Sequence, residues 1–237
     1  MTAVDNQAPT ATAPPSAWAA ELGFASETAR AAGAILMDRY ERLERIHHKS
    51  ARDVVTEADH LSEELVIAAI SDRFPGDAIL AEESGEHRAI SGAAPTAGTG
   101  RVWVIDPLDG TVNYANGLPV FCVSIGFVVD GRAVAGVVLD PTRDELFAAT
   151  ADGPATLNDR AVAASSKAAL TDYVVSLALS GRSAASRAAA LRKAIRISRS
   201  MGSAALALAY VGSGRFDAFV QQGGLSVWDV AAAGLIA

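Results

Sequence analysis

The sequence predicts a mixed α/β protein in which layers of helix pack against layers of sheet. Segments with apolar residues at helical spacing alternate with short apolar runs that are typical of buried strands. Asp130-Gly131 separates two such runs, and this dipeptide is a strong hairpin signal. The chain has 237 residues, half of them hydrophobic and a fifth charged, which suits one large domain or two lobes that share a core.

The first hundred residues are expected to hold two helices and little sheet. A long amphipathic helix is predicted from Trp18 to Ile46, followed by a turn and a short extended piece at 53–56. A second helix, 58–73, ends where Phe74-Pro75-Gly76 breaks the pattern. A short apolar strand, 78–81, ends in Glu82-Glu83-Ser84, and the Gly-rich residues 91–100 indicate a flexible loop.

The middle of the chain is expected to form an antiparallel meander. Its apolar runs are separated by turn residues, chief among them Asp130-Gly131. The predicted strands are 101–105, 121–129, 132–139 and 145–150.

Beyond Gly153 the pattern changes to alternating strands and helices, without internal repeats. The expected order is a strand at 173–179, a helix at 183–194, a strand at 196–199, a helix from Gly202-Ser203 to Gly212-Ser213-Gly214, a strand at 216–221 and a terminal helix that begins at Trp228. We therefore expect a disordered tail at 1–16, an N-terminal α+β lobe at 17–152 that carries the site, and a C-terminal α/β lobe at 153–237.

Composition narrows the function classes. A net charge of −7 argues against a nucleic-acid binder, because only one short basic cluster, 187–199, is present. The single cysteine, Cys122, is too few for a disulfide framework or a thiolate metal site, and its apolar run indicates a buried residue. No apolar run reaches the roughly 20 residues that span a bilayer, and residues 1–17 lack the features of a signal peptide. We expect a cytoplasmic protein with no membrane contact.

Asp106 and Asp109 interrupt an apolar stretch directly after a predicted strand. They could form an acidic turn, but the carboxyl ends of strands are also where ligands bind. Two ionised carboxylates about 4 Å apart repel by about 4 kcal/mol at an effective dielectric constant of about 20. A shared proton, a basic partner or a cation would have to relieve this repulsion.

Other acidic residues lie at similar positions. Glu82 and Glu83 end another short strand, and Asp229 begins the final helix. If these residues converge with Asp106 and Asp109, the site consists of carboxylates, which suit hard cations such as Mg²⁺. Backbone N–H groups at Gly110-Thr111 could then hold phosphate oxygens. The scattered histidines (His47, His48, His60 and His87) are expected at the surface, and Ser84 and Ser124 lack the arrangement of a serine hydrolase.

Five motifs resemble those of the inositol monophosphatase family, in the order found in that family. The longest is Asp106-Pro107-Leu108-Asp109-Gly110-Thr111, with Asn113-Tyr114 and the later residues Pro119, Phe121 and 123–125. The others are 53–59 (DVVTEAD), 82–84 (EES), 199–205 (RSMGSAA) and 228–231 (WDVA). The resemblance covers residues 18–237. It implies a layered α/β/α/β/α sandwich of the sugar-phosphatase type, a homodimer, two or three Mg²⁺ ions per site and inhibition by Li⁺.

The resemblance also assigns roles to residues. Glu82, Asp106 and the Leu108 carbonyl would hold one Mg²⁺, while Asp106, Asp109 and Asp229 would hold a second. Thr111, hydrogen-bonded to Asp59, would orient and help deprotonate the attacking water, so the catalytic set is Thr111, Asp59 and Glu82. The substrate-binding set is Asp109, Gly110, Thr111, Gly202, Ser203, Ala204, Gln222 and Asp229. Lys49 and Asp53 would support the site, and Arg199 would brace the substrate loop or a subunit contact.

Two departures from the family pattern stand out. Seven residues before Asp229, where the animal inositol enzymes have a glutamate, this chain has Gln222, which weakens the expected preference for inositol. The family also continues several dozen residues beyond its Trp-Asp motif, whereas this sequence ends at Ala237. We therefore expect the C-terminal lobe to be truncated, with an unpaired sheet edge.

The resemblance favours Mg²⁺-dependent hydrolysis of a small polyol phosphate, with inositol monophosphate as the leading substrate. A histidinol-phosphate phosphatase with the same mechanism is the alternative, and Asn113-Tyr114 and 123–125 favour the inositol branch. Nucleotide bisphosphate or fructose phosphatase activity matches less well. From other classes, a non-catalytic member that acts through protein contacts and an inactive fragment stay open.

Overall fold

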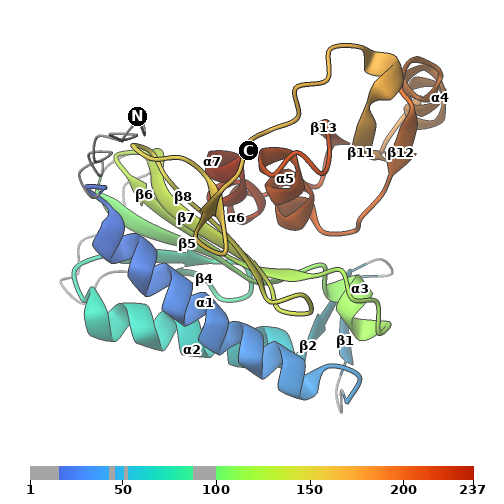
Figure 1. Cartoon of the computed structure of the whole chain (residues 1–237). Coiled ribbons are helices and arrows are strands. Elements are labelled where there is room, and N and C mark those ends of the chain that lie inside the picture. The colour runs from blue at the N-terminus through green and yellow to red at the C-terminus, as the bar shows by residue number, and fades with distance from the viewer. Residues whose placement is uncertain (1–15, 43–45, 51–52, 88–99) are drawn as a thin grey trace, which may run out of the picture.

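An eight-stranded sheet and a three-stranded sheet, with helices between and outside them, make up most of the described protein, and a two-stranded ribbon completes its strands (Figure 1). The computed structural model describes residues 16–42, 46–50, 53–87 and 100–237. The predicted tail at 1–16 and loop at 91–100 lie outside these residues, apart from Ser16 and Gly100. No helix in the described ranges has both the length and the apolar character needed to cross a bilayer.

The larger sheet has eight strands in the order β10-β9-β8-β7-β6-β5-β3-β4. Their bounds are β3 Ala78–Ala81, β4 Gly85–His87, β5 Arg101–Asp109, β6 Cys122–Val129, β7 Arg132–Asp140, β8 Glu145–Thr150, β9 Thr156–Leu157 and β10 Arg160–Ala161. Only β3 and β5 are parallel, so the sheet is mixed. The predicted hairpin is confirmed, since Val129 pairs with Arg132 and both turn residues, Asp130 and Gly131, have positive φ angles.

Helices α1 (Ala19–Arg39) and α2 (Glu57–Arg73) cover one face of this sheet (Figure 1). The prediction of one helix from Trp18 to Ile46 was wrong: Tyr40 leaves the helical region and Glu41 has a φ of +61°. The Tyr40 ring packs 5.2 Å from the Phe121 ring, centroid to centroid, a tertiary contact that the local pattern cannot reveal. Residues Ile46–Ser50 form β1 instead of a helix end and turn, and pair with β2 (Asp53–Thr56).

Helices α5 (Ala204–Gly212), α6 (Val227–Val230) and α7 (Ala233–Ile236) cover the other face of the large sheet. The terminal helix predicted from Trp228 is thus two short helices. They lie very close to the sheet, because a Cβ atom on Gly136 of β7 would meet the Cα atom of Ala232 at 2.7 Å. A short helix, α3 (Thr111–Ala115), follows β5, and a 3₁₀ turn, η1 (Leu170–Asp172), precedes the second sheet.

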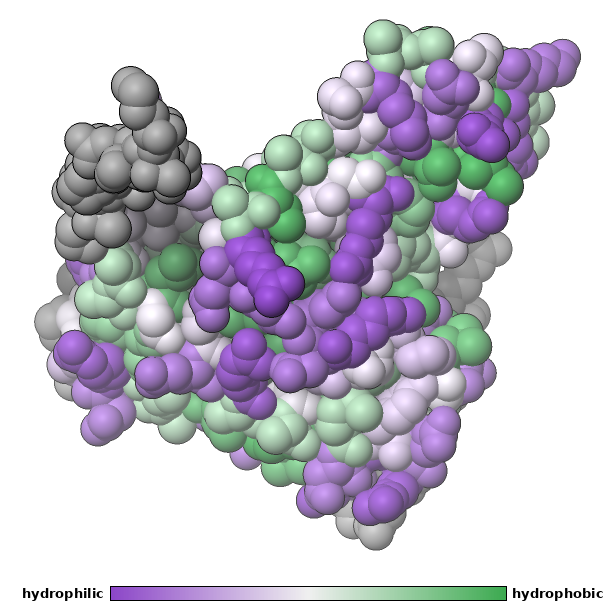
Figure 2. Space-filling model, in the orientation of Figure 1, coloured by the Kyte–Doolittle hydropathy of each residue, from purple (hydrophilic) through white to green (hydrophobic). Residues whose placement is uncertain are grey.

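The second sheet is parallel and small, with strands β12 (Ile197–Arg199), β11 (Val174–Leu179) and β13 (Ala218–Gln222) in that order. Helix α4 (Ala184–Ala194) lies on its outer side, and α5 lies between the two sheets (Figure 1). This gives the expected α/β/α/β/α layering. In Figure 2 the second sheet and α4 project from the body, with hydrophilic side chains over their outer end.

The two sheets are not cleanly separate units. Strands β9 and β10 lie beyond residue 152 but join the large sheet. Helices α5 and α7 share an apolar core with that sheet, through Leu206, Ile236 and Phe147 among others. Helices α5, α6 and α7 are therefore packed directly behind the strands that carry the acidic residues.

Candidate metal centre

A β-bulge in β5 determines how Asp106 and Asp109 are presented. Asp106 pairs with Ser124 of β6, and Asp109 pairs with Cys122, so β5 has one more residue than its partner between the two pairs. In a regular strand, residues three apart point to opposite faces, but an extra residue changes this alternation. The bulge contains Pro107, which has no N–H to donate to a ladder. The two carboxylates are therefore brought to one place.

Asp229 joins these two residues from the far end of the sequence. One carboxylate oxygen from each of Asp106, Asp109 and Asp229 lies within 4.8 Å of the others. The residues are 1%, 9% and 9% exposed. Helix α6 presents Asp229 in a capping box with Ser226, whose backbone N–H donates to Oδ2 of Asp229 at 2.6 Å.

Each carboxylate is oriented through hydrogen bonds to one of its oxygens. The Ser203 hydroxyl and the Ala205 N–H both donate to Oδ2 of Asp109, at 2.6 and 2.7 Å. The Leu108 N–H donates to Oδ1 of Asp106 at 3.1 Å. The N-terminus of α5 thus holds Asp109 in place, which explains why residues 203–205 are essential to the geometry of the centre.

Glu82 reaches Asp106 because β3 and β5 are parallel neighbours. Ala81 pairs with Ile105, and the Glu82 N–H donates to the Ile105 carbonyl at 3.2 Å. Glu82 and Asp106 each come directly after one member of this pair, so they lie side by side. A hydrogen bond between their side chains contributes to the raised pKa of Asp106. The carboxylate of Glu63 on α2 accepts from the N–H groups of Glu83 and Ser84, each at 2.9 Å, and so fixes this turn.

The electrostatics of the cluster favour a bound cation. Burial raises the pKa of Asp106 well above its usual range, and the charges of Glu82 and Asp109 raise it further. Burial also raises the pKa of Asp109, partly offset by the Ser203 and Ala205 hydrogen bonds, and raises that of Asp229 to about 6. Among the lysine and arginine side chains that the structure describes, which do not include Lys49, none forms an ion pair with these three aspartates. A set of oxygen donors without a basic partner suits a hard divalent ion.

Asp59 and Thr111 form a pair beside this cluster. The Thr111 hydroxyl lies 3.0 Å from Oδ1 of Asp59 and 3.0 Å from the Leu108 carbonyl. Oδ2 of Asp59 accepts from the N–H and the hydroxyl of Thr56, which begins α2 with a capping box. Burial raises the pKa of Asp59 to about 6, against the lowering effect of these hydrogen bonds. A carboxylate with this pKa can accept a proton near neutral pH.

Gly110 and Asn113 fix the surroundings of α3, and Asn113 also contacts the loop before α5. Gly110 has a φ of +99°, and a Cβ atom there would lie 2.9 Å from the Val120 carbonyl oxygen, so glycine is required. The Asn113 amide donates to the carbonyls of Val120 and Met201, at 2.7 and 2.8 Å. The predicted substrate loop, 202–204, is therefore held against the helix that follows the metal cluster.

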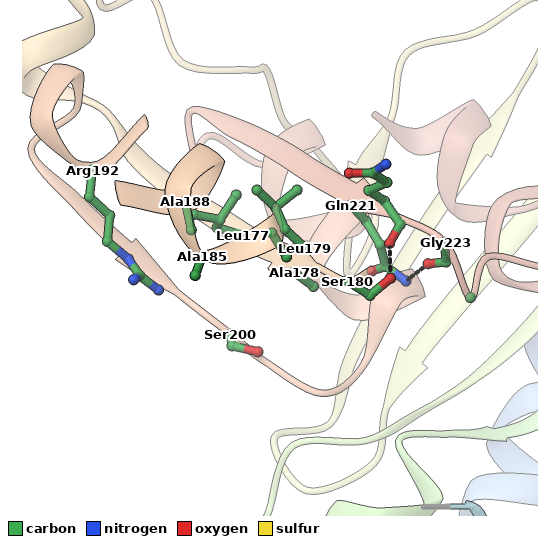
Figure 3. A pocket seen from close by; sticks show the side chains of 13 residues that line it. Leu177, Ala178, Leu179, Ser180, Ala185, Ala188, Arg192, Ser200, Gln221 and Gly223 are labelled. Atoms are coloured by element: carbon green, nitrogen blue, oxygen red, sulfur yellow. Dashed lines mark hydrogen bonds between the residues drawn. The ribbon is translucent and has the colours of Figure 1, made fainter. Parts of the chain in front are cut away.

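A cavity of about 250 Å³ opens beside Asp109 and Asp229. The loop residues Gly202, Ser203 and Ala204, which belong to the expected substrate-binding set, line it. Gln221 also lines it, whereas Gln222 lines an adjoining cavity of about 600 Å³, to which Gln221 contributes as well. Figure 3 shows Gln221 at the end of β13, where its amide contacts the Gly223 carbonyl at 3.4 Å.

The other candidates have ordinary positions. Cys122 is buried, as expected, and burial raises the pKa of its thiol. The Ser124 hydroxyl donates to the Trp228 carbonyl at 3.3 Å, which leaves it without the arrangement of a nucleophile. Arg199 is exposed and donates to the Ser198 carbonyl. The side chains of Lys49 and Asp53 lie outside the described part of the structure.

Several residues of the site were not predicted from sequence. Glu63 and Ser62 share one face of α2 with Asp59, and the Ser62 hydroxyl donates to the Pro107 carbonyl at 3.0 Å. This spacing of three and four residues was a usable signal for Ser62 and Glu63. Gln221 and Ser176, in contrast, lie in the cavity because of the second sheet, and no local pattern marks them.

Comparisons with known proteins agree with this geometry. The profile of the inositol monophosphatase family matches residues 19–237. The chain is 38% identical over 223 residues to Nus factor SuhB of Xylella fastidiosa, covering 89% of this chain and 76% of the relative. It is 36% identical over 218 residues to inositol-1-monophosphatase of a Synechocystis species, covering 89% and 73%. The crystal structure of extragenic suppressor protein suhB from Bartonella henselae superposes with a TM-score of 0.84 at 31% identity, covering 92% of this chain and 83% of that chain.

Proposed function

The chain belongs to the inositol monophosphatase family, a family of metal-dependent phosphatases that act on phosphorylated polyols, and we propose that it hydrolyses inositol monophosphate or a similar small polyol phosphate with Mg²⁺. The observation that carries this proposal is the cluster of Asp106, Asp109 and Asp229, which is buried and has no basic partner among the side chains that the structure describes. The resemblance of the five sequence motifs points to the same chemistry.

The oxygen donors divide into two proposed sets. Glu82, Asp106 and the Leu108 carbonyl would hold one Mg²⁺, and Asp106, Asp109 and Asp229 a second. Bound Mg²⁺ would lower the pKa of the water that attacks, and it would neutralise negative charge on the departing oxygen. The positive charge of the ions would also offset the repulsion between these buried carboxylates.

Thr111 and Asp59 are proposed to manage the proton of the attacking water. Donation from the Thr111 hydroxyl to Asp59 leaves its oxygen free to accept a hydrogen bond from water. As the oxygen of water attacks phosphorus, its proton would pass to the Thr111 oxygen, while the Thr111 proton passes to Asp59. The pKa of about 6 for Asp59 suits this acceptor role near neutral pH.

The remaining residues are proposed to bind substrate. The N–H groups of Gly110 and Thr111 would hold phosphate oxygens. Asp109, Asp229 and the loop Gly202–Ala204 would face the hydroxyls of the alcohol. Gln222, the residue expected from the sequence, and its neighbour Gln221, which lines both adjoining cavities, would offer amide groups to the same hydroxyls.

A panel of phosphate esters tests the proposal. Released phosphate would be measured with Mg²⁺ for myo-inositol 1-phosphate, histidinol phosphate, fructose 1,6-bisphosphate and a nucleotide bisphosphate. We expect the highest kcat/KM for the inositol ester, and no turnover of any polyol ester would overturn the proposal. A preference for histidinol phosphate would select the alternative enzyme.

The similarity to a protein named Nus factor favours a second candidate role, regulation through protein contacts. Calorimetric titration with Mg²⁺ separates the two, because saturable binding is expected of the phosphatase and not of a non-catalytic member. We also propose a homodimer, which analytical ultracentrifugation tests, inhibition by Li⁺, a cytoplasmic location and no nucleic-acid partner.

A further inference from the structure

The second sheet forms one wall of the cavity beside the carboxylates. Strands β11 and β13 are parallel neighbours in which Ser176 pairs with Phe219 and Ala178 with Gln221. All four of these residues line the cavity. Alternation along β11 directs Val175 and Leu177 to the opposite face, where they belong to the core beneath α4. The wall is thus one continuous sheet face with two polar and two apolar side chains.

Ser176 is the unusual member of this wall. It is only 3% exposed, and its hydroxyl makes no hydrogen bond with any residue in the described part of the chain. Among the described residues the only buried side-chain oxygen or nitrogen without a partner is Oδ1 of Asp217, so the Ser176 oxygen still reaches accessible surface. As a residue that lines the cavity, Ser176 has its remaining accessible surface there. The hydroxyl is therefore available to a molecule that enters the cavity.

The neighbours of Ser176 restrict what that molecule can be. Phe219 and Ala178 offer an apolar surface of carbon atoms, on which the C–H face of a ring packs well. The Gln221 amide makes only the 3.4 Å contact with Gly223 noted above, so it retains hydrogen-bonding capacity (Figure 3). Asp109 and Asp229, which also line the cavity, lie at the proposed metal centre. A ligand held by its phosphate at the carboxylates would extend its alcohol part toward this wall.

We propose that Ser176 selects the alcohol part of the substrate by a hydrogen bond to one of its hydroxyl groups, while a carbon face of the ring packs on Phe219 and Ala178. This inference rests on the proposed function and narrows its substrate class. It requires a cyclic polyol with a hydroxyl group away from the phosphate ester. An alkyl or aryl phosphate without such a hydroxyl forms no hydrogen bond with Ser176, so its binding does not depend on this residue.

The test compares two esters that share the phosphate and differ in the alcohol. Myo-inositol 1-phosphate carries ring hydroxyls, whereas the ring of p-nitrophenyl phosphate has none. The variants are Ser176→Ala, which removes the hydroxyl, and Ser176→Thr, which keeps it on a residue suited to a strand. Ser198→Ala is the matched control, because Ser198 lies on the neighbouring strand β12, pairs with Val175 and does not line the cavity. Thermal unfolding of each variant reports on folding.

We expect Ser176→Ala to lower kcat/KM for the inositol ester by roughly 2- to 12-fold, the range of one neutral hydrogen bond. The value for p-nitrophenyl phosphate should stay within about 2-fold, and Ser176→Thr should retain most of the activity on the inositol ester. Equal loss on both esters, or no loss on either, would overturn this inference alone. A wild-type protein that hydrolyses p-nitrophenyl phosphate but no polyol ester would overturn the proposed function, and this inference with it.

Discussion

Ser203 donates a 2.6 Å hydrogen bond to Asp109 from a position 94 residues later in the sequence. The Ala205 N–H donates to the same oxygen. The bulge of β5 and the beginning of α5 are thus one unit, although the sequence separates them. Several predictions about metal binding and catalysis depend on this and on similar connections.

Ser203→Ala is expected to weaken metal binding without unfolding the protein. Asp109 loses a charge-assisted hydrogen bond, worth about 1.5 kcal/mol or more, so the Mg²⁺ concentration for half-maximal activity should rise by about 10-fold. A Mg²⁺ activation curve measures this. Ser186→Ala on the exposed surface of α4 is the control, and an unchanged midpoint in Ser203→Ala would show that Asp109 does not need this support.

Asp106→Asn should stabilise the protein in chelator while it removes activity. Asp106 is a buried carboxylate surrounded by other carboxylates, so a neutral amide of the same shape removes repulsion that costs several kcal/mol at most. The melting temperature in EDTA should rise, Mg²⁺ should no longer raise it, and turnover should fall by about 1,000-fold or more. A lower melting temperature in EDTA would contradict this account.

The stability of the metal-free protein should fall as pH rises from about 4 to about 6. The pKa of Asp229 is raised from 3.8 to about 6, so within this window the folded state binds more protons than the unfolded state. The destabilising effect is absent below the unfolded pKa and complete above the folded one, where it reaches about 3 kcal/mol. Urea denaturation in EDTA across this range measures it, and Asp229→Asn should show a smaller fall.

Asn113→Ala should loosen the substrate loop. The substitution leaves the Val120 and Met201 carbonyls without the amide that bridges them, which costs about 1–3 kcal/mol. We expect a lower melting temperature and a rise in KM for the inositol ester. Asn116→Ala is the matched control, since that exposed side chain bonds only the Val112 carbonyl of its own helix. Equal effects of the two changes would argue against a specific role for Asn113.

Gly110→Ala should be far more damaging than Gly117→Ala, although both glycines have positive φ angles. At Gly117 the added Cβ atom would have no neighbour closer than 3.8 Å. The free energy of unfolding should therefore fall only by the cost of the left-handed backbone conformation for alanine, about 1 kcal/mol. At Gly110 the Cβ atom would also meet the Val120 carbonyl oxygen at 2.9 Å. Unfolding free energies of the two variants separate these effects, and equal losses would show that the clash is absorbed.

Periodicity and turn chemistry predicted most of the fold. The hairpin at Asp130-Gly131 and the alternation after Gly153 depend on local signals, and the structure confirms both. The end of α1 does not depend on local signals, because Tyr40 leaves the helix to pack on Phe121 and Tyr114. The charged residues after Tyr40 continue a helical pattern that tertiary packing overrides.

The acidic residues of the site could be identified from the sequence because each follows a predicted strand or begins a predicted helix. Their convergence required the structure, since it depends on the parallel pairing of β3 with β5 and on the bulge between Asp106 and Asp109. The walls of the cavity were harder to predict. Gln221 and Ser176 line the cavity because of where the second sheet lies, and a single glutamine or serine in a strand carries no local signal of this.

The proposed ligands come from segments that begin at Glu82 and end with Asp229. During synthesis, Asp229 is the last of these side chains to emerge from the ribosome, long after β3 and β5. A nascent chain that lacks α6 holds only part of the donor set, so it cannot capture the ion at full strength. Mg²⁺ would then be bound late in synthesis, at about the stage when α6 and α7 emerge and complete the packing against the large sheet.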